Sequence, residues 1–461
     1  MKEQGIYFNV KTFWSRIIQV MNLIKNKDQR ILSKIMRNYK ILLILLNIYS
    51  LIFFYSCLRG RSSQLANNYY AHHAYAQAIP IFEAALTKTN NTGIKSKLAN
   101  CYRILGKPEK ALPLYADIVK EDKPAPKDLL YFAEVLMNLA RYDEAKIWLI
   151  KFVAENPDDS QGKVLLDNCD KIKTIKPFYQ NITLLPFTKN DESDDNAPVF
   201  FRNGIVYASD RVQHFQLLKE KNPLTGREFI ALYYSEPVND TGFTEPRFFS
   251  AKLTELNRNT SNASFTRDEK RIYFSKNSEE PARNGNYNMQ IYSAETDDFE
   301  HWKNINHLDF CSLESNYMYP AVSPDGKLLF FVMDKGEGTG GLDLFWCKKT
   351  KKGWSHPQSL GPKVNTQAHE CFPYYSSDNK LYFSSKGHTG FGGYDIFFTQ
   401  YDAVKEEWHT PVNMGTPINS PYDDISIAFS NKDSLFGAFT SSRGGRGDAI
   451  YFFKINALTK K

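Results

Sequence analysis

The stretch YPAVSPDGKLLFFV (Tyr319–Val332) places two short apolar strands around a four-residue turn. The turn is Ser323-Pro324-Asp325-Gly326, in which proline presets φ, aspartate can bond nearby backbone and glycine accepts a positive φ. Strands this short and this rich in Val, Leu and Phe are typical of sheets covered on both faces. The stretch therefore predicts a β-hairpin inside a packed β domain.

The same hairpin pattern occurs five times in the C-terminal half of the chain. Aligning the turns places five residues in register, at separations of 65, 57, 53 and 54 residues: Pro198, Ala263, Pro320, Pro373 and Ile427. A period near 50 residues built from strands indicates a β-propeller, in which each repeat forms one blade. The sequence predicts a five-bladed propeller over residues 181–456, with six blades as the alternative if residues 212–249 contain a short, degenerate one.

The two ends of the repeat region are complementary. The last repeat stops at Phe453 without a fourth strand, whereas an extra apolar segment, residues 181–187, precedes the first repeat. We expect this segment to pair with the last blade and close the ring, which removes the exposed edges of an open sheet.

A second block opens the third strand of three repeats and contributes one aspartate to each: Asp343, Asp395 and Asp448. One interpretation makes these aspartates a ring of metal ligands. The other makes each a structural turn residue that bonds backbone amides. Because a residue repeated from blade to blade serves the fold, whereas a binding site needs asymmetry, we predict the structural role, with no metal and no cofactor.

Between residues 62 and 175 the periodicity changes from strand to helix. Three alanines recur at intervals of 33 and 34 residues, and another alanine lies twelve residues before each of them. The pairs are Ala66 and Ala78, Ala99 and Ala111, and Ala133 and Ala145. The pattern resembles tetratricopeptide repeats, in which small residues let paired helices cross closely. Three such repeats form a stable solenoid, and residues 161–173 would supply its capping helix.

The resemblance to tetratricopeptide repeats implies a concave protein-binding surface. The residues expected to face it are Asn67, Tyr70, Asn100, Arg103, Glu134, Met137 and Asn138. Asparagines at equivalent positions are similar to the clamps that grip a peptide backbone, but the lysines of those clamps are missing. Docking of a folded partner is therefore favoured over capture of a peptide tail.

The N-terminal region predicts an export signal. Ile41–Phe54 is nearly all apolar and follows a basic segment, but at fourteen residues it is shorter than the ~20 of a membrane span and fits a signal-peptide core. The following Cys57 completes a segment that resembles a bacterial lipobox. We predict a signal peptide over residues 36–56, lipidation at Cys57, and an upstream extension or incorrectly assigned start over residues 1–35. The alternative is an uncleaved membrane anchor.

Charge and motifs exclude several function classes. Residues 1–56 carry nine Lys and Arg against two acids, a net of +7 that equals the charge of the whole chain, so a nucleic-acid partner is not indicated. The sequence has no GxSxG, HExxH or P-loop motif and no CxxC pair. We predict a non-enzyme without a small-molecule substrate. The alternative is glycan binding or cleavage in the propeller channel, with a metal held by some of His301, His307, His356, His369, His388 and His409.

The order of lipobox, helical repeats and TolB-like propeller repeats resembles the PorE-like lipoproteins of the type IX secretion and gliding machinery. The resemblance implies an α+β multidomain protein on the periplasmic leaflet of the outer membrane, which docks protein subunits of an envelope complex. Those proteins usually continue into an OmpA-like domain, which this sequence lacks before Lys461, so cell-wall anchoring is not expected. A further alternative is a TolB-like role in envelope integrity.

Overall fold

The computed structural model describes Ser15, Ile18, Gln19 and residues 64–456, except 213–220, 223, 239–241, 256, 335–339 and 446. The predicted signal peptide and Cys57 lie outside the described residues. Within them, no helix has the length and apolar character needed to cross a membrane. The chain divides into two compact units, Met1–Asn68 and Tyr69–Lys461, and the second contains the fold described below.

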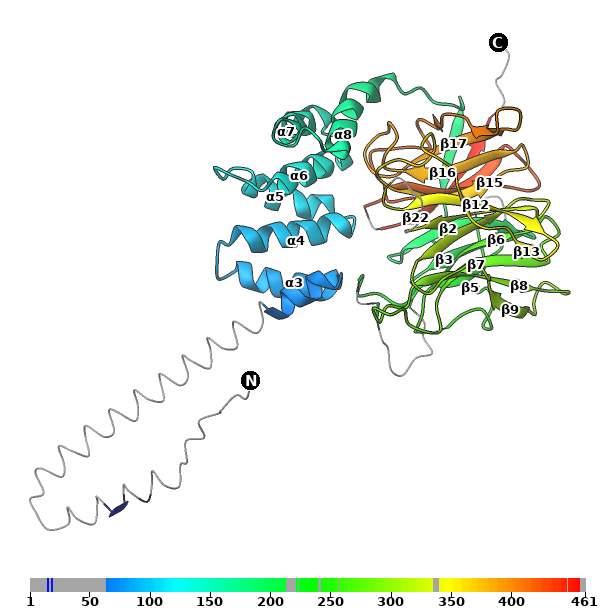
Figure 1. The fold of residues 1–461 in the computed structure, drawn as a ribbon, viewed down its shortest axis with the longest axis horizontal. Coiled ribbons are helices and arrows are strands. Elements are labelled where there is room, and N and C mark those ends of the chain that lie inside the picture. The colour runs from blue at the N-terminus through cyan, green and yellow to red at the C-terminus, as the bar shows by residue number, and fades with distance from the viewer. Residues whose placement is uncertain are drawn as a thin grey trace, which may run out of the picture. The chain divides into compact units, whose positions relative to one another are not determined.

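The N-terminal part of the second unit is a stack of helix pairs, drawn in blue to green in Figure 1. Residues 64–71 are helical and span the boundary between the two units. The helices that follow, all in the second unit, are α3 (Tyr75–Leu86), α4 (Thr92–Ile104), α5 (Pro108–Ile118), α6 (Pro126–Asn138), α7 (Tyr142–Glu155), α8 (Ser160–Lys171) and the 3₁₀ turn η1 (Ile172–Thr174). All six alanines of the predicted repeat are completely buried. The tetratricopeptide-like solenoid is thereby confirmed.

Local sequence fixes where these helices begin. The side chain of Asn91 accepts a hydrogen bond from Ile94 N (3.0 Å) at the start of α4, and Asp159 accepts one from Gly162 N (2.7 Å) at the start of α8. α5 and α6 instead begin with Pro108 and Pro126, where the missing N–H costs nothing.

The C-terminal part is a ring of five small antiparallel sheets. The first three are β2 (Asp195–Phe201), β3 (Gly204–Ser209), β4 (Ala231–Ser235) and β5 (Arg247–Phe248); β6 (Thr260–Phe265), β7 (Arg271–Asn277), β8 (Met289–Glu295) and β9 (Lys303–His307); and β10 (Tyr317–Val322), β11 (Leu328–Met333), β12 (Asp343–Thr350), β13 (Gly353–Trp354) and β14 (Gln358–Ser359). The other two are β15 (Glu370–Tyr375), β16 (Lys380–Ser385), β17 (Asp395–Asp402), β18 (Glu407–Trp408) and β19 (Val412–Asn413); and β20 (Asp424–Phe429), β21 (Phe436–Ser441), β22 (Ala449–Ile455) and β1 (Ile182–Pro186).

The predicted five-bladed propeller is confirmed. β1 pairs antiparallel with β22, from Ile182 opposite Ile455 to Pro186 opposite Tyr451, so the segment before the first repeat closes the last blade as expected. Residues 212–249 supply β4 and β5 of the first blade, and the described part of that segment forms no sixth sheet.

The propeller core lies between the blades and is rich in aromatic rings. Between the third and fourth blades, the ring of Phe330 stacks on Trp346 (centroids 6.2 Å apart) and on Tyr375 (5.0 Å), with Trp408 edge-on at 5.8 Å. Central strands such as β3 are buried along their whole length. Both faces of each blade are thus covered, as short strands of this composition predict.

Hydrogen bonds link the helical repeats to propeller loops within the second unit. Tyr142, the first residue of α7, donates a hydrogen bond from Oη to Phe391 O (2.8 Å). Ala76 N, in α3, donates one to Leu224 O (3.2 Å). Gly392 lies so close to the backbone of Met137 that an added Cβ would be 3.4 Å from it. The ends of α6 and the starts of α3 and α7 are therefore partly covered.

Candidate partner-binding site

A row of polar side chains, here called the polar ladder, crosses the first helices of successive repeats: Tyr70, Asn100, Arg103, Glu134 and Gln161. Asn100 Nδ2 donates to Tyr70 Oη (2.6 Å), and Arg103 donates to Asn100 Oδ1 from Nε (3.1 Å) and Nη2 (2.9 Å). Arg103 Nη1 donates to Glu134 Oε2 (2.7 Å), whose other oxygen accepts from Gln161 Nε2 (2.7 Å). Each helix is thus bonded to the next.

Arg103 is the centre of the ladder. Its guanidinium lies 3.9 Å from the ring centroid of Tyr131, a cation–π contact that adds to the ion pair with Glu134. Burial acts to lower the pKa of Arg103, but Glu134, Tyr115 and Tyr131 together outweigh burial, so the pKa is raised and the side chain stays charged. Because the ladder satisfies its own groups, it offers a partner a rigid surface more than a set of free hydrogen-bonding groups.

The structure brings together four of the seven residues predicted for the concave face: Tyr70, Asn100, Arg103 and Glu134, of which Asn100 is itself buried. The prediction for Met137 is corrected, because its side chain is fully buried in the solenoid core and cannot face a partner. Asn138 is half-buried at the end of α6, and Asn67 is exposed on helix 64–71.

Sequence reasoning missed Gln161, which completes the ladder, and Tyr131, whose ring lies against the guanidinium of Arg103. Gln161 lies on the capping helix, outside the repeat pattern used to choose candidates. Its amide reaches Glu134 because α8 packs beside α6. The order of the helices is the signal that could have indicated this packing.

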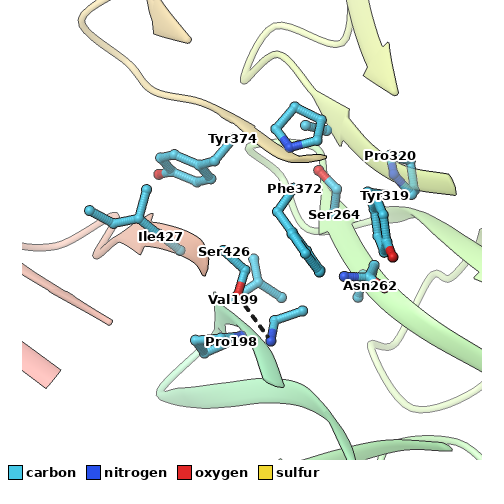
Figure 2. Close-up of a pocket in the computed structure, with 15 residues that line it drawn as sticks. Pro198, Val199, Asn262, Ser264, Tyr319, Pro320, Phe372, Tyr374, Ser426 and Ile427 are labelled. Atoms are coloured by element: carbon cyan, nitrogen blue, oxygen red, sulfur yellow. Dashed lines mark hydrogen bonds between the residues drawn. The ribbon is translucent and has the colours of Figure 1, made fainter. Parts of the chain in front are cut away.

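The propeller axis is the second candidate site, and Figure 2 shows the residues that line it. Each first strand contributes three of them: Ala197, Pro198, Val199, Asn262, Ala263, Ser264, Tyr319, Pro320, Ala321, Phe372, Pro373, Tyr374, Ser426, Ile427 and Ala428. The cavity holds about 40 Å³. Small-molecule pockets are much larger, roughly 300–1,000 Å³, so this cavity has room for only a few waters.

A β-bulge shapes the axis in every blade. The register of each first strand shifts at one residue of left-handed backbone: Ala197 (φ 52°), Asn262 (51°), Tyr319 (56°), Phe372 (52°) and Ser426 (50°). The five positions that the sequence places in register are the residues that follow. Three of these are proline, which a bulge accepts because its extra residue is left out of the hydrogen-bond ladder.

Side chains and hydroxyls close the axis. The rings of Tyr319 and Phe372 stack with centroids 4.2 Å apart. Ala197 N donates to Ser426 Oγ (3.2 Å), and Tyr319 N donates to Ser275 Oγ (2.9 Å), so bulge amides find partners on neighbouring strands. None of the candidate histidines is among the lining residues.

The blade aspartates contact backbone at the start of the third strands. Asp343 Oδ2 accepts from Gly340 N (3.2 Å), and Asp395 Oδ2 accepts from Phe391 N (2.6 Å). These are the contacts of a turn residue. In the part of the chain that the structure describes, no three His, Cys, Asp or Glu side chains are arranged to hold a metal ion.

Asp448 belongs to a different arrangement, here called the seam cluster: Asp194, Asp210, Asp448 and Arg227. It lies where the last blade meets the first. Asp448 N donates to Asp194 Oδ1 (3.0 Å), Asp194 N donates to Asp210 Oδ1 (2.9 Å), and Arg227 Nη1 is 3.3 Å and 3.5 Å from Asp194 Oδ1 and Asp210 Oδ1. Burial, followed by the charge of Asp194, raises the pKa of Asp448 to about 8 and that of Asp210 to about 6.

Comparisons with known proteins give one family model and several distant structural similarities. Residues 71–152 match the family model described as anaphase-promoting complex, cyclosome, subunit 3. No curated protein matches the chain. Similar solved structures include a putative TolB from Agrobacterium tumefaciens (15% identity, TM-score 0.34, 56% of this chain and 76% of that one) and an alpha-L-arabinofuranosidase from Lactobacillus brevis (12%, 0.39, 57% and 92%). Likenesses this distant carry no argument about activity.

Proposed function

We propose that this chain is a docking scaffold of a bacterial envelope complex, of the type IX secretion or gliding kind, tethered to the outer membrane through lipidated Cys57. The observation that carries the proposal is the joining of a tetratricopeptide-like solenoid to a propeller whose axis is filled. Helical repeats of this kind bind proteins along their stacked first helices, which here display the polar ladder. The subunits of the complex are the partners.

The filled axis favours a scaffold over the glycan-acting alternative. A glycan site at the channel needs room for a sugar ring and groups to act on it, and the axial cavity holds about 40 Å³ lined by backbone bulges and two stacked rings. A TolB-like role in envelope integrity uses only the propeller and leaves the solenoid without a task.

Affinity capture tests the docking role. Full-length protein with a C-terminal tag is recovered from detergent-solubilised envelopes, and its companions are identified by mass spectrometry. We expect envelope subunits in near-stoichiometric amounts, lost in N67R/N138R, which places charge at two of the predicted contact positions. The matched control, Q77R/N90R, changes exposed residues on and after α3 and should retain them. Recovery of the tagged protein without companion subunits would contradict the proposal.

The tether is tested separately with C57S. We expect the variant to lose the lipid, measured as the mass of the N-terminal peptide, and to leave the membrane fraction. A C57S protein that stays in the membrane would favour the uncleaved anchor instead.

A further inference from the structure

The third blade carries a basic hairpin that the other blades lack. The β12–β13 hairpin contains four lysines within residues 348–352 and no acid: Lys348, Lys349, Lys351 and Lys352. All four side chains are exposed. Because Lys351 and Lys352 form the turn itself, the charges lie at the outermost tip of the hairpin.

The charges of the basic hairpin are not balanced inside the protein. No carboxylate among the described residues lies within the 4.0 Å of a salt bridge to any of the four amines. Instead, Lys348 Nζ lies 4.9 Å from the ring centroid of Trp346, and Lys349 Nζ lies 4.7 Å from that of Trp354. Burial and then the charge of Arg271 lower the pKa of Lys349, whereas Glu295, which pairs with Arg271 (2.5 Å), acts in the opposite direction.

Equivalent hairpins in neighbouring blades show that this excess is local. In the second blade, residues 295–303 hold four acids, and Lys303 pairs with Asp297. In the hairpin of the fourth blade, Lys405 Nζ lies 3.9 Å from Asp402 Oδ2. Glu407 Oε2 of the same hairpin lies 2.6 Å from Nζ of Lys363, in the connection between the third and fourth blades. The chain beyond residue 56 is neutral by count, so the four lysines are not part of a generally basic surface.

The chemistry of the hairpin indicates what it binds. Lysines are flexible point charges without the planar fork that reads individual phosphates or carboxylates, so they suit a diffuse layer of negative charge. The two tryptophans beneath them belong to the packing of the blades: Trp346 lies in the core cluster with Phe330 and Trp408, and Trp354 packs edge-on against Tyr273. A polyanion chain would require a groove with exposed stacking faces, whereas here Trp346 is only 8% exposed.

We propose that the basic hairpin, residues 348–352, binds an anionic lipid surface through its phosphate headgroups. This contact would hold the third blade against the bilayer. It requires neither a lipid on Cys57 nor the docking of partner subunits, so it stands or falls separately from the proposed function.

The test measures the accessibility of the four lysines and not vesicle binding as a whole. This is necessary because the apolar run Ile41–Phe54 can attach the full chain to vesicles by itself. Full-length protein is mixed with excess vesicles of equal parts phosphatidylglycerol and phosphatidylcholine, or of phosphatidylcholine alone. The acetylation rate of each lysine is then measured by mass spectrometry. We expect Lys351 and Lys352 to be protected about fivefold or more on anionic vesicles only, and the protection to vanish in molar salt.

Paired variants make the result specific. K351Q/K352Q should weaken the salt-sensitive part of the binding roughly 30-fold, about fivefold for each charge. K123Q/K127Q removes the same charge from two exposed lysines, one just before α6 and one in its first turn, and should leave the salt-sensitive binding unchanged. Equal protection on neutral vesicles, or equal loss in both variants, overturns the proposal. Equal protection by soluble polyglutamate or by inorganic phosphate would also overturn it, since the ligand would then be a free anion and not a surface.

Discussion

At the scale of single residues, the propeller axis depends on one unusual backbone conformation repeated in each blade. The left-handed residue differs each time, being Ala, Asn, Tyr, Phe or Ser. Conformations of this kind cost free energy in non-glycine residues. Their presence in all five blades indicates that neighbouring strands hold them in place.

The second blade allows a stabilising change at this bulge. Asn262 has the same left-handed φ as the residues before Pro198, Pro320 and Pro373, but Ala263 follows it. We expect A263P to stabilise the protein by about 0.4–1 kcal/mol, because proline restricts the unfolded chain, and to raise the thermal midpoint by about 1–3 °C.

The control for this change is V322P, in which the lost N–H donates to Ser264 Oγ (2.9 Å). It should cost about 1–3 kcal/mol. A lower midpoint for A263P would show that the bulge of the second blade is not equivalent to the others.

Position 103 of the polar ladder requires an arginine, which lysine cannot replace. Arg103 uses Nε, Nη1 and Nη2 toward two acceptors on different helices, and a lysine has a single ammonium. We expect R103K to lower the free energy of unfolding by about 1–2 kcal/mol. R141K changes an exposed pair with Glu144 and should stay within about 0.5 kcal/mol. Similar losses from both would contradict the structural role of the ladder. Urea unfolding followed by far-UV circular dichroism measures them.

At the scale of elements, β1 determines whether the ring is closed. Leu184 packs against the cluster around Phe453 and Met414, whereas the next residue, Leu185, is 46% exposed. L184D should lower the free energy of unfolding by roughly 2–4 kcal/mol, because it places a charge in an apolar seam. L185D should change it by less than about 0.5 kcal/mol. Thermal unfolding of both variants checks this, and a large loss in L185D would mean that β1 is rotated from the assigned register.

Elements that depend on local chemistry could be predicted from the sequence, and those that depend on neighbours could not. The hairpins, the closing segment and the helix pairs follow from turn residues and spacing. The burial of Met137 depends on what packs at the end of α6, which its helical position does not reveal. The basic hairpin is visible as a run of lysines in the sequence, but a charge count over the whole chain hides it. The left-handed bulge residues share no residue type, so only the prolines beside them mark the place.

At the scale of the whole molecule, the seam cluster links ring closure to pH. Asp448 faces Asp194 and Asp210, together with the single guanidinium of Arg227; Asp423 adds a further negative charge. Three carboxyls thus share one guanidinium in a partly buried place, and the charge of Lys107 also acts on Asp194. Each of the three pKa values is raised, to about 8 for Asp448 and about 6 for Asp210, so the folded state holds protons that the unfolded chain releases.

The sign of the pH dependence follows from these shifts. A carboxyl whose pKa is higher in the folded state than in the unfolded state favours folding at low pH, and this contribution is lost as pH rises through the folded pKa. We therefore expect the free energy of unfolding to fall between about pH 4, near the unfolded pKa, and pH 8, near the folded pKa of Asp448, by about 1.4 kcal/mol per pH unit for each proton involved. In D448N the slope of this fall should decrease by an amount equal to at most one proton, and the protein should be more stable near pH 8 than the parent. D158N changes an exposed residue and should follow the curve of the parent protein. Denaturant midpoints across this range measure the effect. Parallel curves for the parent protein and D448N would show that Asp448 stays charged in the folded state and that the seam does not respond to pH.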